Sequence, residues 1–210
     1  CLDDFDVAAR RHLPLPVYSY IAGAAETNSS LAANRSAFTA YDFVPRVMVD
    51  INQRDMGVNL LGRHYDAPFG IAPMGLAALS AYRGDMVLAQ AAAHSNIPMV
   101  MSGSSLIRLE DVAVVNRDAW FQAYLPGDDA GIAALLQRVK NAGCQTLVIT
   151  VDTAVAANRE NNVRAGFTIP VRPGLRLAWQ GLSHPRWLVG TFLRTLMKHG
   201  MPHFENSYAT

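Results

Sequence analysis

The sequence predicts an α/β fold of parallel strand-helix units, arranged as the first half of a closed barrel. Short β-branched or apolar runs alternate with helical stretches, which is typical of parallel βα units. Polar residues collect where each run ends, and proteins of this class place their active sites at the carboxyl ends of the strands. The four runs are Pro68–Gly75, Pro98–Gly103, Ala119–Leu125 and Thr146–Asp152.

The composition is that of a globular enzyme. Half of the 210 residues are apolar and the net charge is +1, so the overall charge indicates no nucleic-acid partner. Cys1 and Cys144 have neither disulfide nor metal-ligand spacing, which favours a cytoplasmic protein without a metal site. We expect no signal peptide and no membrane span, because no stretch reaches roughly 18 apolar residues. Because Cys stands first instead of Met, we expect the natural start to lie upstream.

Residues 1–66 are predicted to form an N-terminal helical cap and a hairpin. Asp3 and Asp4 favour the start of a first helix, where acidic side chains complement the helix dipole. Pro16 begins a second helix, which stops at Gly23. The remaining elements are a helix over Ser29–Thr39 and a hairpin made of Val58–Leu60 and His64–Tyr65.

Residues 67–160 are predicted to form the first half of the barrel. The helices between the strands are expected over Asp85–Ser95, Leu109–Val115 and Ala130–Asn141. Asp128 and Asp129 cap the last of these, and its apolar residues recur at helical spacing. A complete eight-stranded barrel needs about 250 residues, so this region accounts for strands one to four.

Residues 161–210 form a variable basic and apolar segment. No Asp or Glu occurs between Glu160 and Glu205, and tryptophans alternate with basic residues. We expect residues 172–200 to bind a membrane surface, with a helix that opens at Pro185 and closes at Gly200. The expected apolar face is Trp187, Leu188, Phe192, Leu193 and Leu196, with Arg186, Arg194 and Lys198 toward anionic headgroups. A substrate-covering loop or an oligomer contact is the alternative, and Gly181 and Gly190 argue against one continuous helix.

Each polar residue at a strand end has a plain structural interpretation when it is taken alone. Gln122 fits a hydrogen-bonded core residue, Ser102 a turn residue and Asp152 a helix cap. Arg159 fits a surface residue and Tyr20 a packing residue. The functional interpretation is favoured because four polar positions fall at the same end of successive strands. Amide and hydroxyl groups combined with close backbone approach are what a flavin ring requires.

Several runs resemble the FMN-dependent α-hydroxy-acid dehydrogenases and oxidases. The resemblance covers nearly all of residues 5–165, in order, and implies a (β/α)8 TIM barrel of the FMN-dependent type. Only strands 1–4 and the N-terminal helical cap of that barrel lie in this sequence. The matching runs are Leu13–Tyr20, Asn34-Arg35, Ile71–Gly75, Trp120–Tyr124, and Thr150–Thr153 followed by Arg159-Glu160.

The resemblance implies FMN as cofactor. Backbone atoms of four residues would lie against the reactive edge of the flavin, namely Ala72, Pro73, Met74 and Gly75. The polar edge of the ring would be hydrogen-bonded by Ser102, Gln122 and Thr150.

The resemblance also implies the substrate contacts and the catalytic groups. Tyr20 and Arg159 would hold the substrate carboxylate, the arginine through a charge-assisted pair. Tyr124 would contact the substrate hydroxyl or the developing carbonyl oxygen. Asp152 would orient a catalytic histidine, which we expect in a C-terminal half outside this sequence. None of the six histidines present stands in the family's catalytic context.

The function implied is oxidation of a small L-2-hydroxy acid, such as lactate, mandelate or glycolate, to its 2-oxo acid. Two mechanisms are open: the substrate carbon loses a proton, or the substrate hydroxyl loses a proton while a hydride is transferred from the carbon. At the position of Gly75, the family's dehydrogenases often have Gly and its oxidases often have Ala. The glycine here therefore favours a quinone or another acceptor over oxygen. An oxygen-using oxidase and a non-catalytic structural fragment are the alternatives. We expect a homo-oligomer, cytoplasmic and peripheral at the inner face of the plasma membrane.

Overall fold

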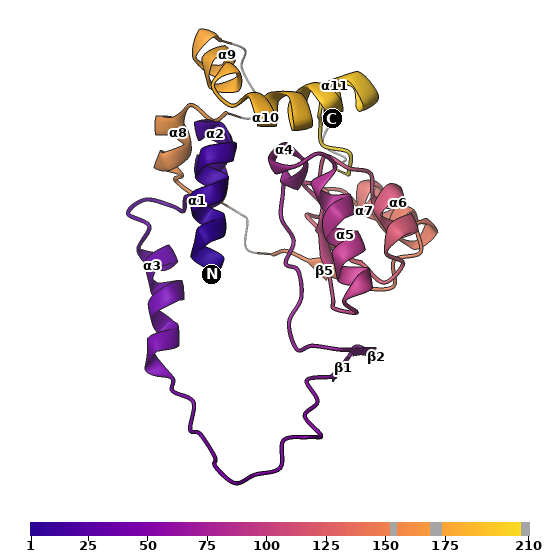
Figure 1. Cartoon of the computed structure of the whole chain (residues 1–210). Helices are drawn as coiled ribbons and strands as arrows, with labels where there is room; N and C mark the ends of the chain where they lie inside the picture. The colour runs from indigo at the N-terminus through magenta and orange to yellow at the C-terminus, as the bar shows by residue number, and fades with distance from the viewer. Residues whose placement is uncertain (152–154, 169–173, 207–210) are drawn as a thin grey trace. The chain divides into compact units, whose positions relative to one another are not determined.

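The computed structural model describes residues 1–151, 155–168 and 174–206. The chain forms two compact units, which Figure 1 shows coloured along the sequence. The cap unit comprises Cys1–Asp55 and Val155–Leu188, and the sheet unit comprises Met56–Ala154 and Val189–Thr210.

The cap unit is helical, as the sequence predicts for its N-terminal part. Pro16 stands in the first turn of its second helix, and Gly23 is the C-cap. The predicted third helix divides after Ser36 into an α-helix and a 3₁₀ turn. Its helices are α1 (Leu2–His12), α2 (Leu15–Ala22), α3 (Ser29–Ser36), η1 (Ala37–Ala40), α8 (Glu160–Ala165), α9 (Leu175–Leu182) and α10 (Pro185–Trp187).

Helices α2 and α8 pack together although they lie far apart in the sequence (Figure 1). The Ser19 hydroxyl donates to the backbone oxygen of Asn161 at 3.1 Å. The Asn161 side chain donates to the backbone oxygen of Ala24 at 3.2 Å. A Cβ atom at Gly23 would lie 2.6 Å from the Ser19 backbone oxygen, so the close approach requires glycine there.

Residues 41–55 form no helix or strand and expose many apolar side chains. Phe43 and Met48 are fully exposed, and several neighbours nearly so. Large exposed apolar side chains that gather in one segment are typical of interaction surfaces in folded proteins.

The sheet unit contains a hairpin and a parallel sheet. The predicted hairpin is confirmed as β1 (Val58–Leu60) paired antiparallel with β2 (Arg63–Tyr65). The three parallel strands are β3 (Val100–Ser102), β4 (Trp120–Ala123) and β5 (Leu147–Ile149), in that order. The predicted strand at Pro68–Gly75 shrinks to a single parallel bridge between Ile71 and Met99. Pro68 and Pro73 have no N–H to donate, which limits the ladder to this short stretch.

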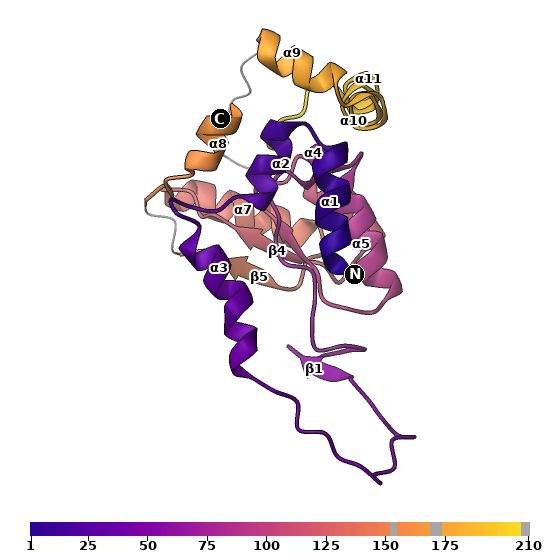
Figure 2. The ribbon, with the colours of Figure 1, turned by 60° about the vertical axis from the view of Figure 1, so that its left-hand side comes forward.

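Three helices pack on the sheet at the predicted positions: α5 (Gly84–His94), α6 (Leu109–Val115) and α7 (Asp129–Asn141). Met101 and Phe121 are almost completely buried between sheet and helices, with Leu109 and Val112 of α6. Figure 2 shows α7 beside β4 and β5. The predicted cap of α7 is confirmed, because the Asp128 carboxylate accepts from the Gly131 N–H at 2.8 Å. A short helix α4 (Ala77–Ser80) was not predicted.

The helix predicted from Pro185 to Gly200 forms, but its expected apolar face is wrong at Trp187. It consists of α10, a π-helical turn η2 (Leu188–Leu193) and α11 (Arg194–His199), with Gly200 as C-cap. Trp187 is buried instead of exposed. The Arg194 guanidinium lies 4.0 Å from the ring centroid of Tyr82, so it is engaged within the protein. Within the described ranges, no helix has both the length and the apolarity to cross a membrane.

Candidate functional site

Three polar side chains form a continuous row across the carboxyl ends of β3, β4 and β5. Ser102 and Gln122 are register partners and are almost completely buried. The Ser102 hydroxyl donates to Oε1 of Gln122 at 3.3 Å, and Nε2 of Gln122 donates to the Thr150 hydroxyl at 2.8 Å. We call Ser102, Gln122 and Thr150 the polar row. The sequence predicted these three residues for one site, and the structure brings them together.

The backbone after β3 adds a donor to the polar row. The Gly103 N–H donates to Oε1 of Gln122 at 3.3 Å, and the Ser104 N–H donates to the Ser102 hydroxyl at 3.1 Å. A Cβ atom at Gly103 would lie 2.8 Å from the backbone oxygen of Gln122. Only glycine therefore lets the loop cross this close to β4 without a shift.

The loop after Ile71 lies at the same end of the sheet. Ala72, Pro73 and Met74 are exposed and Gly75 is half-buried. The Leu76 N–H donates to the backbone oxygen of Ser104 at 3.3 Å, which ties this loop to the one after β3. The exposed backbone of residues 72–75 is thus available to a ligand beside the polar row.

Tyr124 follows directly after β4, and its side chain is 48% exposed. It therefore stands at the strand end with its phenol accessible to a ligand. Asp152, the predicted catalytic carboxylate, lies outside the described residues.

In the cap unit, Tyr20 and Arg159 lie together, as the sequence led us to expect. The Arg159 guanidinium is 5.6 Å from the ring centroid of Tyr20, within the range of a cation–π contact. Phe167 also stacks on Tyr20, with ring centroids 4.7 Å apart. Arg159 is exposed and precedes the first residue of α8. A guanidinium beside a phenol hydroxyl offers a carboxylate a charged and a neutral donor.

The polar row has the chemistry that the pyrimidine portion of a flavin requires. This part of the ring offers both carbonyl acceptors and an N–H donor. The row offers two hydroxyls, a primary amide and the Gly103 N–H, all uncharged. The absence of a side chain at Gly103 lets the loop cross within contact distance of the Gln122 backbone oxygen. The fold and the donor set therefore define part of a flavin-binding α/β barrel.

The family model described as FMN-dependent dehydrogenase matches residues 9–209, and the chain belongs to this family. The (S)-mandelate dehydrogenase of Pseudomonas putida is 32% identical over 206 residues, which is 98% of this chain and 51% of the relative. An L-lactate dehydrogenase of Ectopseudomonas mendocina is 35% identical over 185 residues, 88% of this chain and 48% of the relative. The chain thus spans about half the length of the curated relatives it matches.

Solved structures agree with this assignment. A crystal structure of (S)-mandelate dehydrogenase, described as a monotopic membrane protein, superposes with a TM-score of 0.88 at 34% identity. The match covers 99% of this chain and 54% of that one. A mandelate oxidase structure gives a TM-score of 0.75 at 30% identity, over 80% of this chain and 50% of that one. The resemblance read from the sequence and the partial barrel fold are thereby confirmed, and FMN is the cofactor of the family.

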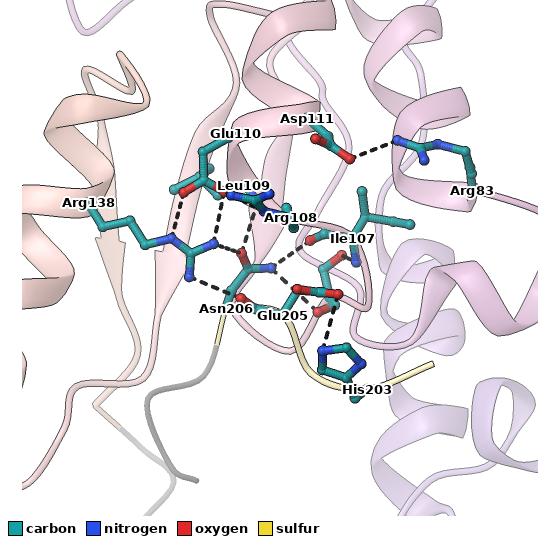
Figure 3. A network of polar contacts seen from close by, with 11 residues as sticks. Arg83, Ile107, Arg108, Leu109, Glu110, Asp111, Arg138, His203, Glu205 and Asn206 are labelled. Carbon is teal, nitrogen blue, oxygen red and sulfur yellow. Dashed lines mark hydrogen bonds and ion pairs between the residues drawn. The ribbon is translucent and has the colours of Figure 1, made fainter. Parts of the chain in front are cut away.

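Two polar groups in the sheet unit were not found from the sequence. Asp85 in α5 is 2% exposed, and a hydrogen bond from Ser105 reaches its carboxylate. Its Oδ2 has no hydrogen-bond partner within the described part of the chain, and burial raises its pKa above the usual range. The other group joins Glu110, Arg138 and Asn206 (Figure 3). Both depend on contacts between distant parts of the chain, for which no local pattern exists.

Proposed function

We propose that this chain forms the N-terminal part of an FMN-dependent enzyme that oxidises a small L-2-hydroxy acid to the 2-oxo acid. The observation that carries this proposal is the polar row at the ends of three adjacent parallel strands. The family membership and the names of the relatives, mandelate and lactate dehydrogenases, support the substrate class.

The polar row would hold the flavin, and the backbone of Ala72–Gly75 would line its reactive edge. When bound, FMN accepts the two electrons of the oxidation. Gln122 orients the row, because its amide contacts Ser102 through one atom and Thr150 through the other. Replacing these internal contacts by contacts to the ring costs little, since each group keeps a partner.

The substrate would be held through its carboxylate by Tyr20 and Arg159. A guanidinium recognises a carboxylate by a charge-assisted and often bidentate contact. Stacking on Phe167 fixes the ring plane of Tyr20 and so the direction of its hydroxyl. Tyr124, accessible after β4, would hydrogen-bond the substrate hydroxyl and the carbonyl oxygen that replaces it.

The remaining groups of the site would come from a C-terminal half of the barrel, in the same or in a second polypeptide. That half would supply a histidine as base, oriented by Asp152. Two features of the described chain support a partner body. Strand β5 pairs only with β4 among the described strands, which leaves the backbone groups of one edge open. The apolar side chains of residues 41–55 are also exposed.

The electrons would pass to a quinone or another protein at a membrane surface. The relative described as a monotopic membrane protein supports this location. In α9, three exposed apolar side chains recur at the spacing of one helix face: Leu175, Trp179 and Leu182. An exposed tryptophan in an acid-free, basic segment is typical of helices that lie at a lipid interface.

The test is made on the full-length protein that contains this chain. Replacing Gln122 by Leu removes the centre of the polar row, and we expect weaker FMN binding measured by flavin fluorescence. Gln137→Leu is the matched control, since Gln137 lies exposed on α7. Wild-type protein is then assayed with glycolate, lactate and mandelate, first with oxygen and then with a quinone or dye. Equal FMN affinity in the two variants would contradict the proposed site, and oxygen turnover equal to dye-linked turnover would identify an oxidase.

A further inference from the structure

The loop between β3 and α6 is held by a residue from a distant part of the sheet unit. Asn206 is 4% exposed, and its amide is fully engaged. Oδ1 accepts from the Leu109 N–H at 2.9 Å. Nδ2 donates to the backbone oxygens of Ile107 at 2.8 Å and Ser105 at 3.4 Å. Figure 3 shows the Asn206 side chain pointing into the turn that leads to α6.

Asn206 accepts a hydrogen bond from the N-terminus of α6, as a local capping residue does in most helices. The N-cap residue of α6, Arg108, makes no side-chain cap hydrogen bond. Leu109 is the first residue of α6 and is buried, so its N–H would lack a partner without a capping acceptor. The acceptor comes instead from Asn206, 97 residues further along the chain.

An arginine fixes Asn206 in this position. Arg138 of α7 binds the Glu110 carboxylate through Nε at 2.7 Å and Nη2 at 2.9 Å. The same guanidinium donates to the backbone oxygen of Glu205 at 3.0 Å and to Oδ1 of Asn206 at 3.3 Å. The Glu205 N–H donates to the Ser105 backbone oxygen at 3.3 Å. Residues 205 and 206 are therefore fastened to both α6 and α7.

The loop that Asn206 holds begins in the polar row. The Ser105 N–H donates to the Ser102 backbone oxygen at 3.1 Å, and the Ser104 N–H donates to the Ser102 hydroxyl at 3.1 Å. Any shift of the Ser105 and Ile107 carbonyls is thereby passed to Ser102 and Gly103. We infer that Asn206 is a positioning residue for the flavin: it holds this loop so that the Ser102 hydroxyl and the Gly103 N–H meet the polar edge of the ring. This inference rests on the proposed function of the polar row.

The test is a double-mutant cycle on the FMN-loaded full-length protein, with Asn206→Ala, Ser102→Ala and the double variant. The FMN dissociation constant is measured by flavin fluorescence, and the environment of the ring by its visible absorption spectrum. We expect Asn206→Ala to weaken FMN binding roughly three- to tenfold, since a buried hydrogen-bond group loses its partner. We also expect the absorption spectrum of bound FMN to shift. The loss of FMN affinity in the double variant should be smaller than the product of the two single losses, because both residues act through one loop.

Met201→Ala is the matched control, because it removes an exposed side chain from the same segment. It is expected to leave FMN affinity and spectrum unchanged. Thermal unfolding is recorded for every variant, since loss of stability alone lowers the midpoint without shifting the spectrum of bound flavin. Hydrogen exchange of the Leu109 amide in the apoprotein gives a readout without FMN, and we expect faster exchange in Asn206→Ala.

An unchanged spectrum in Asn206→Ala, or single effects that multiply in the double variant, would overturn the inference. Failure of the wild type to bind FMN would instead overturn the proposed function. If Asn206→Ala does not fold, Asn206→Asp replaces it. That side chain keeps an acceptor for the Leu109 N–H but turns a second oxygen toward the Ile107 and Ser105 carbonyls. The same spectral shift is expected there, and its absence would equally refute the positioning role.

Discussion

Arg159 and Tyr20 are the two residues that we propose to bind the substrate carboxylate. The guanidinium lies over the phenol ring and is exposed, so a carboxylate ligand can reach both groups. The charge supplies attraction and the planar fork supplies orientation.

In the full-length enzyme, Arg159→Met is expected to lower kcat/KM by the equivalent of about 2–5 kcal/mol, the usual cost of losing one partner of a desolvated charge pair. We expect both a lower kcat and a higher KM, because orientation of the substrate stabilises the transition state. Steady-state kinetics with mandelate and lactate measure this. Arg164→Met is the control, because Arg164 is exposed and pairs with Glu160 one turn away. A loss of the same size in both variants would show that Arg159 has no special role.

Glu110 provides a pH test of the contacts around α6. Its hydrogen bonds to Arg138 hold the pKa of the carboxyl at about 2, below the ordinary value of 4.5. A carboxyl with a lowered folded-state pKa stabilises the protein fully above the unfolded value, and loses that contribution as pH falls from 4.5 toward 2. Because the pair is partly exposed, we expect a small effect, under about 1 kcal/mol.

Urea unfolding of wild type and Glu110→Gln between pH 3 and pH 7 measures this effect. The difference between their midpoints is expected to be constant above the ordinary carboxyl pKa and to shrink below it. Glu26→Gln is the control, since Glu26 lies exposed in the cap unit. A difference that stays constant down to pH 3 would show that the Glu110–Arg138 pair is not intact in solution.

At the scale of elements, the loop after β3 depends on one glycine. Gly103→Ala would place a methyl group 2.8 Å from the Gln122 backbone oxygen, and backbone cannot move aside as a flexible side chain does. We expect Gly103→Ala to destabilise the protein by about 1–3 kcal/mol, as overpacking does elsewhere. Thermal unfolding measures the change. Gly127→Ala is the matched control, because open space surrounds Gly127. Equal midpoints for the two variants would contradict the close approach described.

The exposed apolar side chains of α9, Leu175, Trp179 and Leu182, allow a separate test of the proposed membrane binding. Trp179→Ser combined with Leu182→Ser should reduce flotation of the full-length protein with vesicles that contain anionic lipid. Val114→Ser removes an equally exposed apolar side chain from α6 and serves as control. Retained flotation of the α9 variant would leave this helix without a membrane role.

Most helices were predicted from the sequence because their signals are local, whereas α4, α8 and α9 were not predicted. Asp128, Gly23 and Pro185 mark helix ends through contacts within one turn, and all three stand where expected. The predicted strand around Ile71 was too long, since proline removes ladder donors that an apolar run does not reveal. The face of the last helix was wrong at Trp187, because which side a helix buries depends on its neighbours.

The polar row was predictable because parallel strands bring their carboxyl ends together at one edge of the sheet. Alternation along each strand then places Ser102 and Gln122 on the same face. The support from Asn206 was not predictable, since a lone asparagine far along the chain carries no sign of its partner.

For the whole molecule, the open edge of β5 and the exposed apolar residues 41–55 fit a chain that spans about half the length of its relatives. A barrel removes open edges by closure, so a second set of strands would pair with the open edge of β5.

The measurement that tests this account most directly is anaerobic reduction of the bound flavin in the full-length protein. Addition of L-lactate, L-mandelate or glycolate is expected to bleach the visible absorption band of FMN. The D-enantiomer of lactate or mandelate should leave it unchanged. A protein that holds FMN but keeps its absorption with all of these acids would contradict the proposed function.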